Sequence, residues 1–534
     1  MSYSCKRRDF LKLSACSILA SGAALHLGGC NDSKTLQQPS RSASFGLTSN
    51  PSINFTQDCE VLIIGSGIAG LSAAIEPLKA KRKVLVVDKL DLLGGESFAS
   101  NGVFLVAGTE IQKKAGFASD IDKTWESYRS QLPQDLDPLT LSFQEKLFKN
   151  QCNWINLLVN EMGSQFADPS TYLDKDDPRG ILLPKLGIGD MESVMVPLKD
   201  KLVDLGLTTT LDLAAAAFIT DQDGIASGVR FHSLKTNELI DISAQKIVVA
   251  TGGFISNQQM VQKNLPDWVN ARCQTSASMG EGQNLCRQIN GKISGLNYPI
   301  NLISDIPTVS DWGSFAPVIC LTPQGNRFAA EDDRFAAANK CYAEYMGFWW
   351  SIFDKQLMES KQTPNVAKTL EKNKKRVFES CETLEDLAEK INVPFENLKK
   401  SFDEYEQAIK NSKEDPVGRT RFLKNLEPPY TAIKLFPSRY TSYGGASVDE
   451  TGHVLNNLGQ AIKNVFCCGS CMDGCYSGLA SAGTFGWMVG QQITEELNEE
   501  LPIDTKGRSV KKSTEDPDAL DNVKDALSGA LDGK

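Results

Sequence analysis

The residues best placed for chemistry in this 534-residue sequence form a glycine-rich turn at 65–70, GSGIAG. The turn lies between a buried apolar run, EVLII, and a helix start, LSAAIEPLKA. In that context Gly65 permits a tight turn, Gly67 lets the backbone approach a pyrophosphate, and Gly70 lets helix and strand pack closely. A second apolar run ends at Asp88, whose carboxylate can accept hydrogen bonds from ribose hydroxyls. The pattern predicts a site for a dinucleotide.

Two later segments favour FAD over NAD and carry a family resemblance. Residues 94–97 read GGES shortly after the acid, and residues 250–254 read ATGGF at the end of a β-rich stretch. This order resembles the flavoprotein subunits of the fumarate reductase and succinate dehydrogenase superfamily, and within it the soluble, exported fumarate-reductase-like branch. The resemblance covers about residues 58–495. Together the motifs and the resemblance imply that FAD is bound by Gly65, Ser66, Gly67, Ile68, Ala69, Gly70, Asp88, Lys89, Gly95, Glu96, Ser97, Ser100, Asn101, Gly102, Ala215, Thr251, Gly252, Glu281, Ser470, Gly478 and Leu479.

The same segments predict how the flavin is held. Relatives in membrane complexes attach their flavin through a histidine, but the matching segment 94–102, GGESFASNG, contains none, so we expect non-covalent FAD. Ser470 stands where the family usually has a glutamate. Gly478 and Leu479, near a helix start, can face the flavin pyrimidine oxygen, where N–H groups stabilise negative charge.

The resemblance implies an α/β fold with a Rossmann-like, discontinuous FAD-binding domain and an inserted α+β capping domain. Within the cap, Thr383 can cap the helix LEDLAEKI, and Pro394 can open the amphipathic run FENLKKSFDEYEQAIK. We expect an export signal at 1–30, a linker at 31–55, the FAD-binding domain at 56–300 and 437–497, the capping domain at 301–436 and a flexible tail at 498–534.

The first thirty residues resemble a twin-arginine export signal, which a receptor reads and which is excluded from the fold. Residues 6–12 read KRRDFLK and precede a weakly apolar run. Twin-arginine pathways carry folded proteins, which suits a cofactor that is loaded in the cytoplasm. The run ends in LGGC, which resembles a lipobox with Cys30 as the acylated residue. These features predict a location in the periplasm or on the outer face of the cytoplasmic membrane, with lipid anchoring.

Composition limits the partners. The formal net charge of -10 gives no electrostatic reason to expect nucleic acid. After residue 30 no stretch reaches the roughly 18 unbroken apolar residues of a membrane helix, so a lipid anchor would be the sole membrane contact. Cys467, Cys468, Cys471 and Cys475 crowd together, but we expect small buried hydrophobes rather than a metal site. No C-x-x-C-H haem motif occurs, so electrons must come from a separate donor, such as a cytochrome or a quinol-linked protein.

The resemblance also implies catalytic residues. Reductases of this branch transfer a hydride to one carbon of an activated C=C, and a protein acid protonates the neighbouring carbon. In the family that acid is an arginine after a Gly-x-Arg-Phe…Glu segment, and residues 325–334, GNRFAAEDDR, make Arg334 its match. Arginine hardly ever deprotonates in water, so it needs a relay that reprotonates it. Asp311 matches the relay carboxylate of the family, whereas Ser314 stands where its relay arginine would be.

Other departures from the family concern the substrate. His232 and His453 lie in hairpin-like segments and are expected at the surface, so the fumarate-binding histidines are missing. The closing segment is shortened where the family has its substrate-carboxylate arginine. A small dicarboxylate would then have too few charged partners, which favours a larger, less charged, aromatic or cyclic substrate. Tyr440, Tyr443 and Tyr476 are candidate hydrogen-bond donors to it.

These observations predict an exported FAD reductase of an enoate or enone in an anaerobic electron-transfer chain. One alternative runs the flavin in the opposite direction, as a desaturase resembling the ketosteroid dehydrogenases of this superfamily, whose closing run the segment 476–486 resembles. Another alternative is a non-catalytic electron-transfer flavoprotein. A capping domain over the flavin argues against the latter, because bare electron transfer needs no closed substrate cavity.

Overall fold

The computed structural model describes residues 53–500 apart from short internal gaps. The predicted export signal, Cys30 and most of the linker and tail lie outside the described residues, as does Tyr476. No helix in the described part of the chain is long and apolar enough to cross a membrane. The gaps are residues 118–119, 131, 133–135, 137, 174–179, 361–362, 364, 412–414, 422 and 476–477.

A mixed eight-stranded sheet forms the larger unit, in the order β18-β19-β8-β1-β2-β5. In addition, β7 pairs with β8, and β6 pairs with β7. The neighbours from β19 to β5 pair in parallel, so their carboxyl ends share one edge. Ligands bind at this edge in open α/β sheets. The predicted α/β class with a Rossmann-like sheet is confirmed. The strands are β1 (Phe55–Ile64), β2 (Val84–Val87), β5 (Thr208–Thr210), β6 (Leu213–Thr220), β7 (Ala226–Ser233), β8 (Leu239–Val249), β18 (His453–Leu455) and β19 (Ala461–Cys467).

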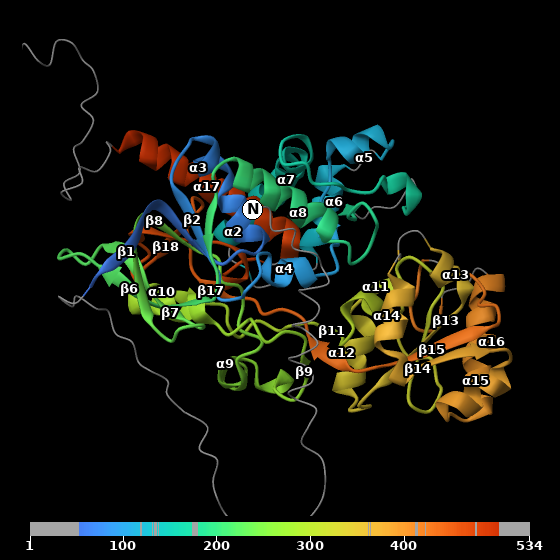
Figure 1. Cartoon of the computed structure of the whole chain (residues 1–534). Helices are drawn as coiled ribbons and strands as arrows, with labels where there is room; N and C mark the ends of the chain where they lie inside the picture. Colours follow the sequence, from blue (N-terminus) through green and yellow to red (C-terminus); the bar gives the residue numbers. More distant parts are fainter. Residues whose placement is uncertain are drawn as a thin grey trace, which may run out of the picture.

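Helices cover one face of this sheet, and α17 (Gly478–Glu499) packs on α2, the helix that the glycine turn opens (Figure 1). Glycines make that approach possible. A Cβ at Gly486 would lie 2.1 Å from the carbonyl oxygen of Ala69, and a Cβ at Gly483 would lie 2.0 Å from the ring of Trp154. The motif GTFGWMVG is therefore a helix-packing surface. The other helices of this layer are α2 (Ile68–Ala73), α3 (Ile75–Lys79), α7 (Pro138–Asn160) and α8 (Glu192–Asp204).

The second unit, at the right in Figure 1, is built on an antiparallel sheet in the order β12-β13-β15-β14. Thr383 accepts a hydrogen bond from the backbone N–H of Asp386 and so caps α15, as predicted. The helix α16 begins directly after Pro394. The elements named here are β12 (Ile319–Leu321), β13 (Trp349–Phe353), β14 (Val377–Cys381), β15 (Tyr430–Leu435), α15 (Leu384–Ile391) and α16 (Phe395–Asn411).

A three-stranded sheet joins the two units. Its central strand β16 (Pro437–Arg439) pairs antiparallel with β11 (Leu302–Ser304) and parallel with β9 (Arg272–Cys273). The chain therefore enters and leaves the second unit through paired strands. One hydrophobic cluster of that unit draws on residues from Phe254 onward, before the predicted start at 301, and the bounds 301–436 stay a prediction.

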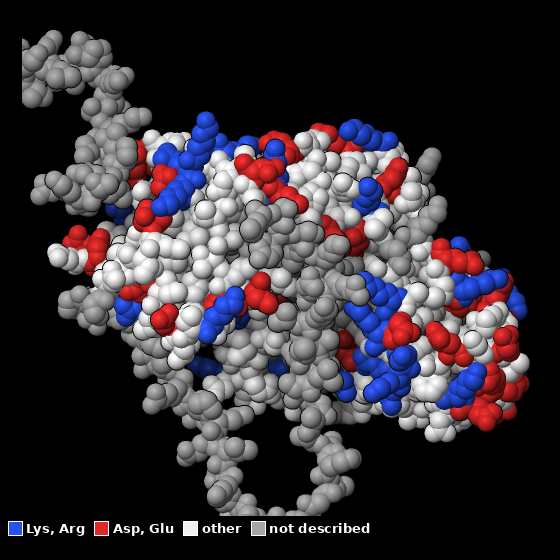
Figure 2. All heavy atoms as spheres, viewed as in Figure 1, with Lys and Arg blue, Asp and Glu red and all other residues white. Residues whose placement is uncertain are grey.

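The face of the molecule in Figure 2 carries both signs of charge side by side. Exposed lysines gather on the second unit over α14 (Val366–Lys372) and the short helix η3 (Lys374–Arg376). Acidic side chains surround this group on the same face. The described part of this face is therefore mixed in charge.

Candidate active site

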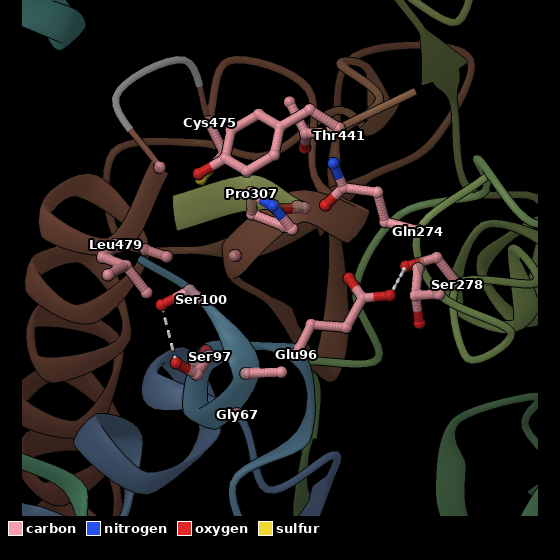
Figure 3. Close-up of a pocket in the computed structure, with 18 of the residues that line it drawn as sticks. Gly67, Glu96, Ser97, Ser100, Gln274, Ser278, Pro307, Thr441, Cys475 and Leu479 are labelled. Carbon is pink, nitrogen blue, oxygen red and sulfur yellow. Dashed lines mark hydrogen bonds between the residues drawn. The ribbon is translucent and has the colours of Figure 1, made fainter. Parts of the chain in front are cut away.

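A cavity of about 1780 Å³ lies between the carboxyl edge of the large sheet and the second unit. Its walls come from the glycine turn, the segment after β2, the loop before α10 (Glu281–Gln288) and several segments of the second unit. Common small-ligand pockets measure about 300–1,000 Å³, so this cavity suits a dinucleotide together with a substrate. Figure 3 shows Gly67, Glu96 and Ser97 on one side of it, facing Gln274 and Thr441 on the other.

The three glycines of the turn serve different purposes. Gly65 has φ +109°, and a Cβ there would lie 2.3 Å from the carbonyl oxygen of Ala250. A Cβ at Gly70 would lie 2.0 Å from the carbonyl oxygen of Gly65. Gly67 differs, because its Cβ would meet only the hydroxyl of Ser97 at 3.3 Å. The fold itself thus requires the first and third glycines, whereas the second keeps the cavity open for its ligand.

Asp88 holds this turn in place from the end of β2. Its Oδ2 accepts hydrogen bonds from the backbone N–H of Ser66 at 2.7 Å and from the Ser66 hydroxyl at 2.5 Å. Its Oδ1 accepts from the backbone N–H of Leu90 at 2.9 Å. The Ser66 hydroxyl oxygen in turn accepts from the N–H of Gly94 at 2.9 Å. Asp88 therefore joins three parts of the cavity wall, and its contact with a ribose stays a prediction.

Side chains from distant segments complete the wall. Glu96 accepts a hydrogen bond from the Ser278 hydroxyl at 2.6 Å, which is visible in Figure 3. Lys89 contacts Glu281 and the carbonyl oxygen of Ala277. Sequence reasoning missed Ser278, and it also missed Gln274, Thr441 and Cys475, which line the cavity as well. No local motif marks these residues, because only tertiary packing brings their segments to the cavity.

Most of the predicted cofactor residues meet at this cavity. Gly70 does not line it but packs beneath the turn. Asn101 is buried behind the wall, and its side chain contacts Asp311 and the carbonyl oxygen of Pro307. The residues that do line the cavity are Gly65, Ser66, Gly67, Ile68, Ala69, Asp88, Lys89, Gly95, Glu96, Ser97, Ser100, Gly102, Ala215, Thr251, Gly252, Glu281, Ser470, Gly478 and Leu479.

Arg334 and Asp311, the predicted acid and relay, lie together in the wall formed by the second unit. Asp311 sits near the end of α11 (Pro307–Trp312), and Arg334 lies just before α12 (Ala336–Ala343). The guanidinium Nε is 3.2 Å from Oδ1, and Nη2 donates to Oδ2 at 3.3 Å. The guanidinium carbon also lies 5.2 Å from the ring centroid of Tyr440. The pair is therefore fixed by two contacts and an aromatic face.

Burial shapes the acidity of this pair. Burial raises the pKa of Asp311, although Arg334 and Asn101 counteract the rise by stabilising the carboxylate. Burial alone would lower the pKa of Arg334, but Asp311 and then Tyr440 outweigh it, so the pKa is raised. Arg334 therefore gives up a proton only if another group replaces that proton. A carboxyl with a raised pKa is a suitable group to supply it.

Tyr440 and Tyr443 line the cavity near Arg334. Burial raises the pKa of Tyr443 to about 12, and the neighbouring Tyr440 adds to the rise while Arg334 opposes it. Tyr443 is therefore a hydrogen-bond donor at physiological pH. The two phenols give this part of the cavity an aromatic, polar lining, and their role as hydrogen-bond donors to a substrate stays a prediction.

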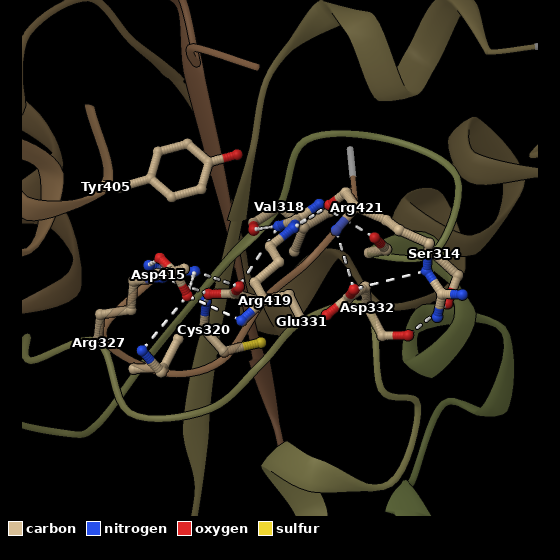
Figure 4. A network of polar contacts seen from close by, with 12 residues as sticks. Ser314, Val318, Cys320, Arg327, Glu331, Asp332, Tyr405, Asp415, Arg419 and Arg421 are labelled. Atoms are coloured by element: carbon tan, nitrogen blue, oxygen red, sulfur yellow. Dashed lines mark hydrogen bonds and ion pairs between the residues drawn. The ribbon is translucent and has the colours of Figure 1, made fainter. Parts of the chain in front are cut away.

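A buried ionic network involves the segment just before Arg334 (Figure 4). Arg327 donates to Glu331 at 2.7 and 2.8 Å and to Asp415 at 3.0 Å. Arg419, also fully buried, lies 3.4 Å from Glu331. Arg419 donates to the carbonyl oxygens of Gly313, Ala316 and Val318 as well. Arg327 and Glu331 of the Gly-x-Arg-Phe…Glu segment thus fix the loop that carries the acid, and sequence reasoning missed Arg419 and Asp415.

The late cysteines lie in the core of the large unit. Cys467 and Cys471 are completely buried, with their sulfurs 3.3 Å apart. Burial raises the pKa of Cys468 well above its usual value. Within the described ranges, no group of three or more histidine, cysteine or acidic side chains is arranged to hold a metal ion. These thiols behave as packing residues, and Cys475 alone among them lines the cavity.

The FAD binding domain family matches residues 60–143 and 183–485 of this chain, and the chain belongs to that family. A probable fumarate reductase, Ifc3, of Shewanella frigidimarina is 22% identical over 459 residues, which are 82% of this chain and 75% of that protein. The acrylate reductase flavoprotein subunit of Shewanella woodyi is 25% identical over 461 residues, which are 81% of this chain and 89% of that protein. The predicted membership of the fumarate reductase and succinate dehydrogenase flavoprotein superfamily is confirmed.

Solved structures share the fold. The open form of a flavocytochrome c3 fumarate reductase has a TM-score of 0.66 at 22% identity, covering 83% of this chain and 79% of that one. The 3-ketosteroid delta1-dehydrogenase of Sterolibacterium denitrificans has a TM-score of 0.65 at 17% identity, covering 83% and 100%. The chain is an FAD-dependent oxidoreductase, and the glycine turn and open cavity described above fit FAD as its cofactor.

Proposed function

We propose that this chain is an exported FAD-dependent reductase of an activated C=C bond in an enoate or enone, with Arg334 as the proton donor. The observation that carries the proposal is the Arg334–Asp311 pair, which lines the same cavity as the glycine turn. Because Arg334 lines the same cavity as the cofactor motifs, a substrate that binds in this cavity would lie within its reach. The acrylate reductase among the relatives supports the same class of substrate.

Bound, reduced FAD supplies the hydride for one carbon of the double bond. The guanidinium of Arg334 donates its proton to the neighbouring carbon, and the two transfers together reduce C=C to CH–CH. Asp311, which lines the cavity, takes up a proton from water there and passes it to Arg334 through their two contacts, so the guanidinium is never left neutral for long. Tyr440 stacks near the guanidinium and helps to fix its orientation.

The proposal includes an external electron donor, a cytochrome or a quinol-linked protein, and non-covalent FAD. It places the protein in the periplasm or on the outer face of the cytoplasmic membrane, after twin-arginine export and with a lipid at Cys30. The motifs KRRDFLK and LGGC support this location. Acid precipitation tests the flavin linkage directly. All of the FAD should appear in the supernatant, and flavin that stays with the precipitated chain would contradict the proposal.

A second candidate is a desaturase of the ketosteroid-dehydrogenase type. Tyr440 and Tyr443 line the cavity, and phenols are suitable groups to take or give a proton beside a ketone. The fold shared with the 3-ketosteroid dehydrogenase supports this alternative to the same extent as it supports the first. Arg334 beside Asp311 favours reduction, because a cation with a proton relay is built to donate protons.

Anaerobic reoxidation of the reduced flavoprotein tests the proposal. The protein is bleached with one equivalent of dithionite and mixed with a panel of enoates and enones, and the flavin absorbance band is followed. Rapid return of the oxidised spectrum with members of the panel is the expected result. If none of them reoxidises the flavin, and saturated ketones instead bleach the oxidised protein, the reductase proposal is wrong and the desaturase holds.

A further inference from the structure

A second arginine, Arg421, lines the same cavity as Arg334. It comes from the segment between α16 and β15, far along the chain from the acid. Among the described residues, the cationic side chains in the cavity wall are Lys89, Arg334 and Arg421. Lys89 contacts Glu281 beside the cofactor motifs, and Arg334 is engaged with Asp311. Of these three cations, Arg421 is the one that neither the predicted cofactor site nor the proposed proton donation uses.

Asp332 fixes the backbone on which Arg421 stands. Its Oδ2 accepts hydrogen bonds from the backbone N–H groups of Thr420 and Arg421, both at 3.1 Å, and from the Thr420 hydroxyl at 3.1 Å. The Nε of Arg421 lies 3.6 Å from the same oxygen. From the other side, the buried Arg419 donates to the carbonyl oxygen of Arg421 at 2.8 Å. Figure 4 shows Arg421 and Asp332 on the side of the buried network away from Arg327.

This anchoring makes Arg421 a pre-organised group. The backbone on which the guanidinium stands is set by buried contacts, so a ligand need not order that segment on binding. The side chain keeps 36% of its surface exposed, whereas that of Arg419 is fully buried. A guanidinium carries five N–H donors and can serve more than one acceptor at once. Its planar fork matches a carboxylate in a bidentate manner.

Asp332, which holds the backbone of Arg421, also lies close in the chain to Arg334. Asp332 stands two residues before Arg334, and the Ser314 hydroxyl donates to the Asp332 carbonyl oxygen at 3.1 Å. The backbone N–H of Ser314 donates to the carbonyl oxygen of Asp311 at 3.0 Å. In an α,β-unsaturated acid, the carbon that receives the proton is the carbon that bears the carboxylate. A group that binds this carboxylate must therefore stand near the proton donor, and Arg421 is held by Asp332, two residues before Arg334 in the chain.

Building on the reductase proposed above, we infer that Arg421 binds the carboxylate of the substrate, which is then a mono-anionic enoate rather than an enone. The family's usual carboxylate arginine is missing from the shortened closing segment, and Arg421 supplies the same charge from the second unit. The tyrosines lining the cavity contact the uncharged remainder of the molecule. Arg421 thus sets specificity, while Arg334 carries out the proton transfer.

A pair of matched ligands tests the inference on the purified, FAD-loaded protein. We would titrate 3-phenylpropanoate and 4-phenylbutan-2-one, which differ in carboxylate against acetyl, and follow the flavin difference spectrum. The wild type should bind the carboxylate at least about tenfold more tightly than the ketone. Arg421→Gln should abolish that preference, and Arg421→Lys should keep part of it. Arg287→Gln, which removes an exposed charge on α10, should leave it unchanged.

Two results would overturn the inference: no carboxylate preference in the wild type, or a full preference that persists in Arg421→Gln. Reoxidation by cinnamate and by the matching enone, 4-phenylbut-3-en-2-one, separates this failure from failure of the reductase. If both reoxidise the reduced flavin and Arg421→Gln leaves their ratio of kcat/KM unchanged, Arg421 is not the carboxylate group although the reductase stands. If neither is reduced by any variant while saturated ketones bleach the flavin, the reductase itself is wrong.

Discussion

Arg334 and Asp311 meet through two nitrogen–oxygen contacts of 3.2 and 3.3 Å inside the cavity that the glycine turn also lines. Asp311 comes from the last turn of α11, and Arg334 comes from the segment just before α12. Asn101, from the segment after β2, contacts the same carboxylate and links the acid pair to the cofactor side of the cavity. A side-chain contact therefore joins the Arg334–Asp311 pair to the predicted flavin-binding side of the cavity wall.

Removal of the proton donor should stop turnover without loss of the cofactor. Arg334→Gln is expected to lower kcat by roughly 10²–10⁴-fold, the usual contribution of a general acid. The flavin content per chain should stay at the wild-type level, because Arg334 contacts Asp311 and aromatic rings rather than the glycine turn. Steady-state rates and the flavin-to-protein absorbance ratio check this. Wild-type turnover in the variant would exclude Arg334 as the acid.

Loss of the relay should have a milder effect with a pH signature. Asp311→Asn keeps the shape of the side chain but cannot carry a proton. We expect kcat to fall about 10–100-fold, part of the usual acid–base contribution, because Arg334 must then recover its proton from solvent. The pH–rate profile should lose the limb that belongs to the carboxyl with the raised pKa. A profile identical to that of the wild type would assign Asp311 a structural role only.

The second glycine of the turn should be separable from the third. Gly67→Val is expected to abolish FAD binding and leave a folded apoprotein, because a side chain there meets only Ser97 within the protein. Gly70→Ala should prevent folding instead, since its Cβ would lie 2.0 Å from the carbonyl oxygen of Gly65. Circular dichroism and flavin content distinguish the two outcomes. Full flavin in Gly67→Val would contradict the assignment of the site.

His453 should make stability depend on pH. Burial lowers its pKa, but contacts with Asp449 and Glu496 outweigh this and raise it from 6.5 to about 9. Glu496 also pairs with Lys246. A raised pKa in the folded state contributes stability that is fully present below about pH 6.5 and is lost as the pH rises through about 9. This residue was expected at the surface, yet its side chain is only 16% exposed.

The measurement is the melting temperature between pH 6 and pH 10. The wild type should lose stability across that window, by on the order of 2 kcal/mol after allowance for solvent screening. His453→Gln should show a flatter curve over the same range and a lower melting temperature at pH 6. Parallel curves for the two proteins would contradict the ion-pair assignment.

The buried network behind the active site should be costly to break. Arg419→Met leaves four backbone carbonyl oxygens without their donor and weakens the pairing of Glu331. We expect a loss of about 3–5 kcal/mol in the free energy of unfolding, as for other broken buried pairs. Lys399→Gln, which removes an exposed pair on α16, should change it by less than about 0.5 kcal/mol. Urea unfolding curves compare the two variants, and equal midpoints would contradict the prediction.

The parts predicted from the sequence are those with a local pattern. The glycine turn and the cap of α15 follow from apolar runs and short motifs, and the Rossmann-like sheet follows from the family resemblance that those motifs carry. The first strand begins at Phe55, five residues before the apolar run, because pairing with β8 recruits exposed polar residues that no periodicity marks. Ser278, Gln274 and Arg421 reach the cavity only through tertiary packing. The pairing of Arg334 with Asp311 was predicted solely because the family resemblance joined two separate motifs.

The discontinuous sheet has a consequence for biosynthesis. Strand β19 pairs with β8, and α17 packs on α2. Nevertheless β19 and α17 are translated after the whole second unit, whereas β8 and α2 are translated before it. Ser470, Gly478 and Leu479 of the cavity wall are also translated after the second unit. The complete cavity wall therefore forms only after β19 and α17 have joined the large unit, and we expect the protein to acquire its cofactor after that step. A chain truncated before β19 should accumulate as apoprotein that the cell degrades.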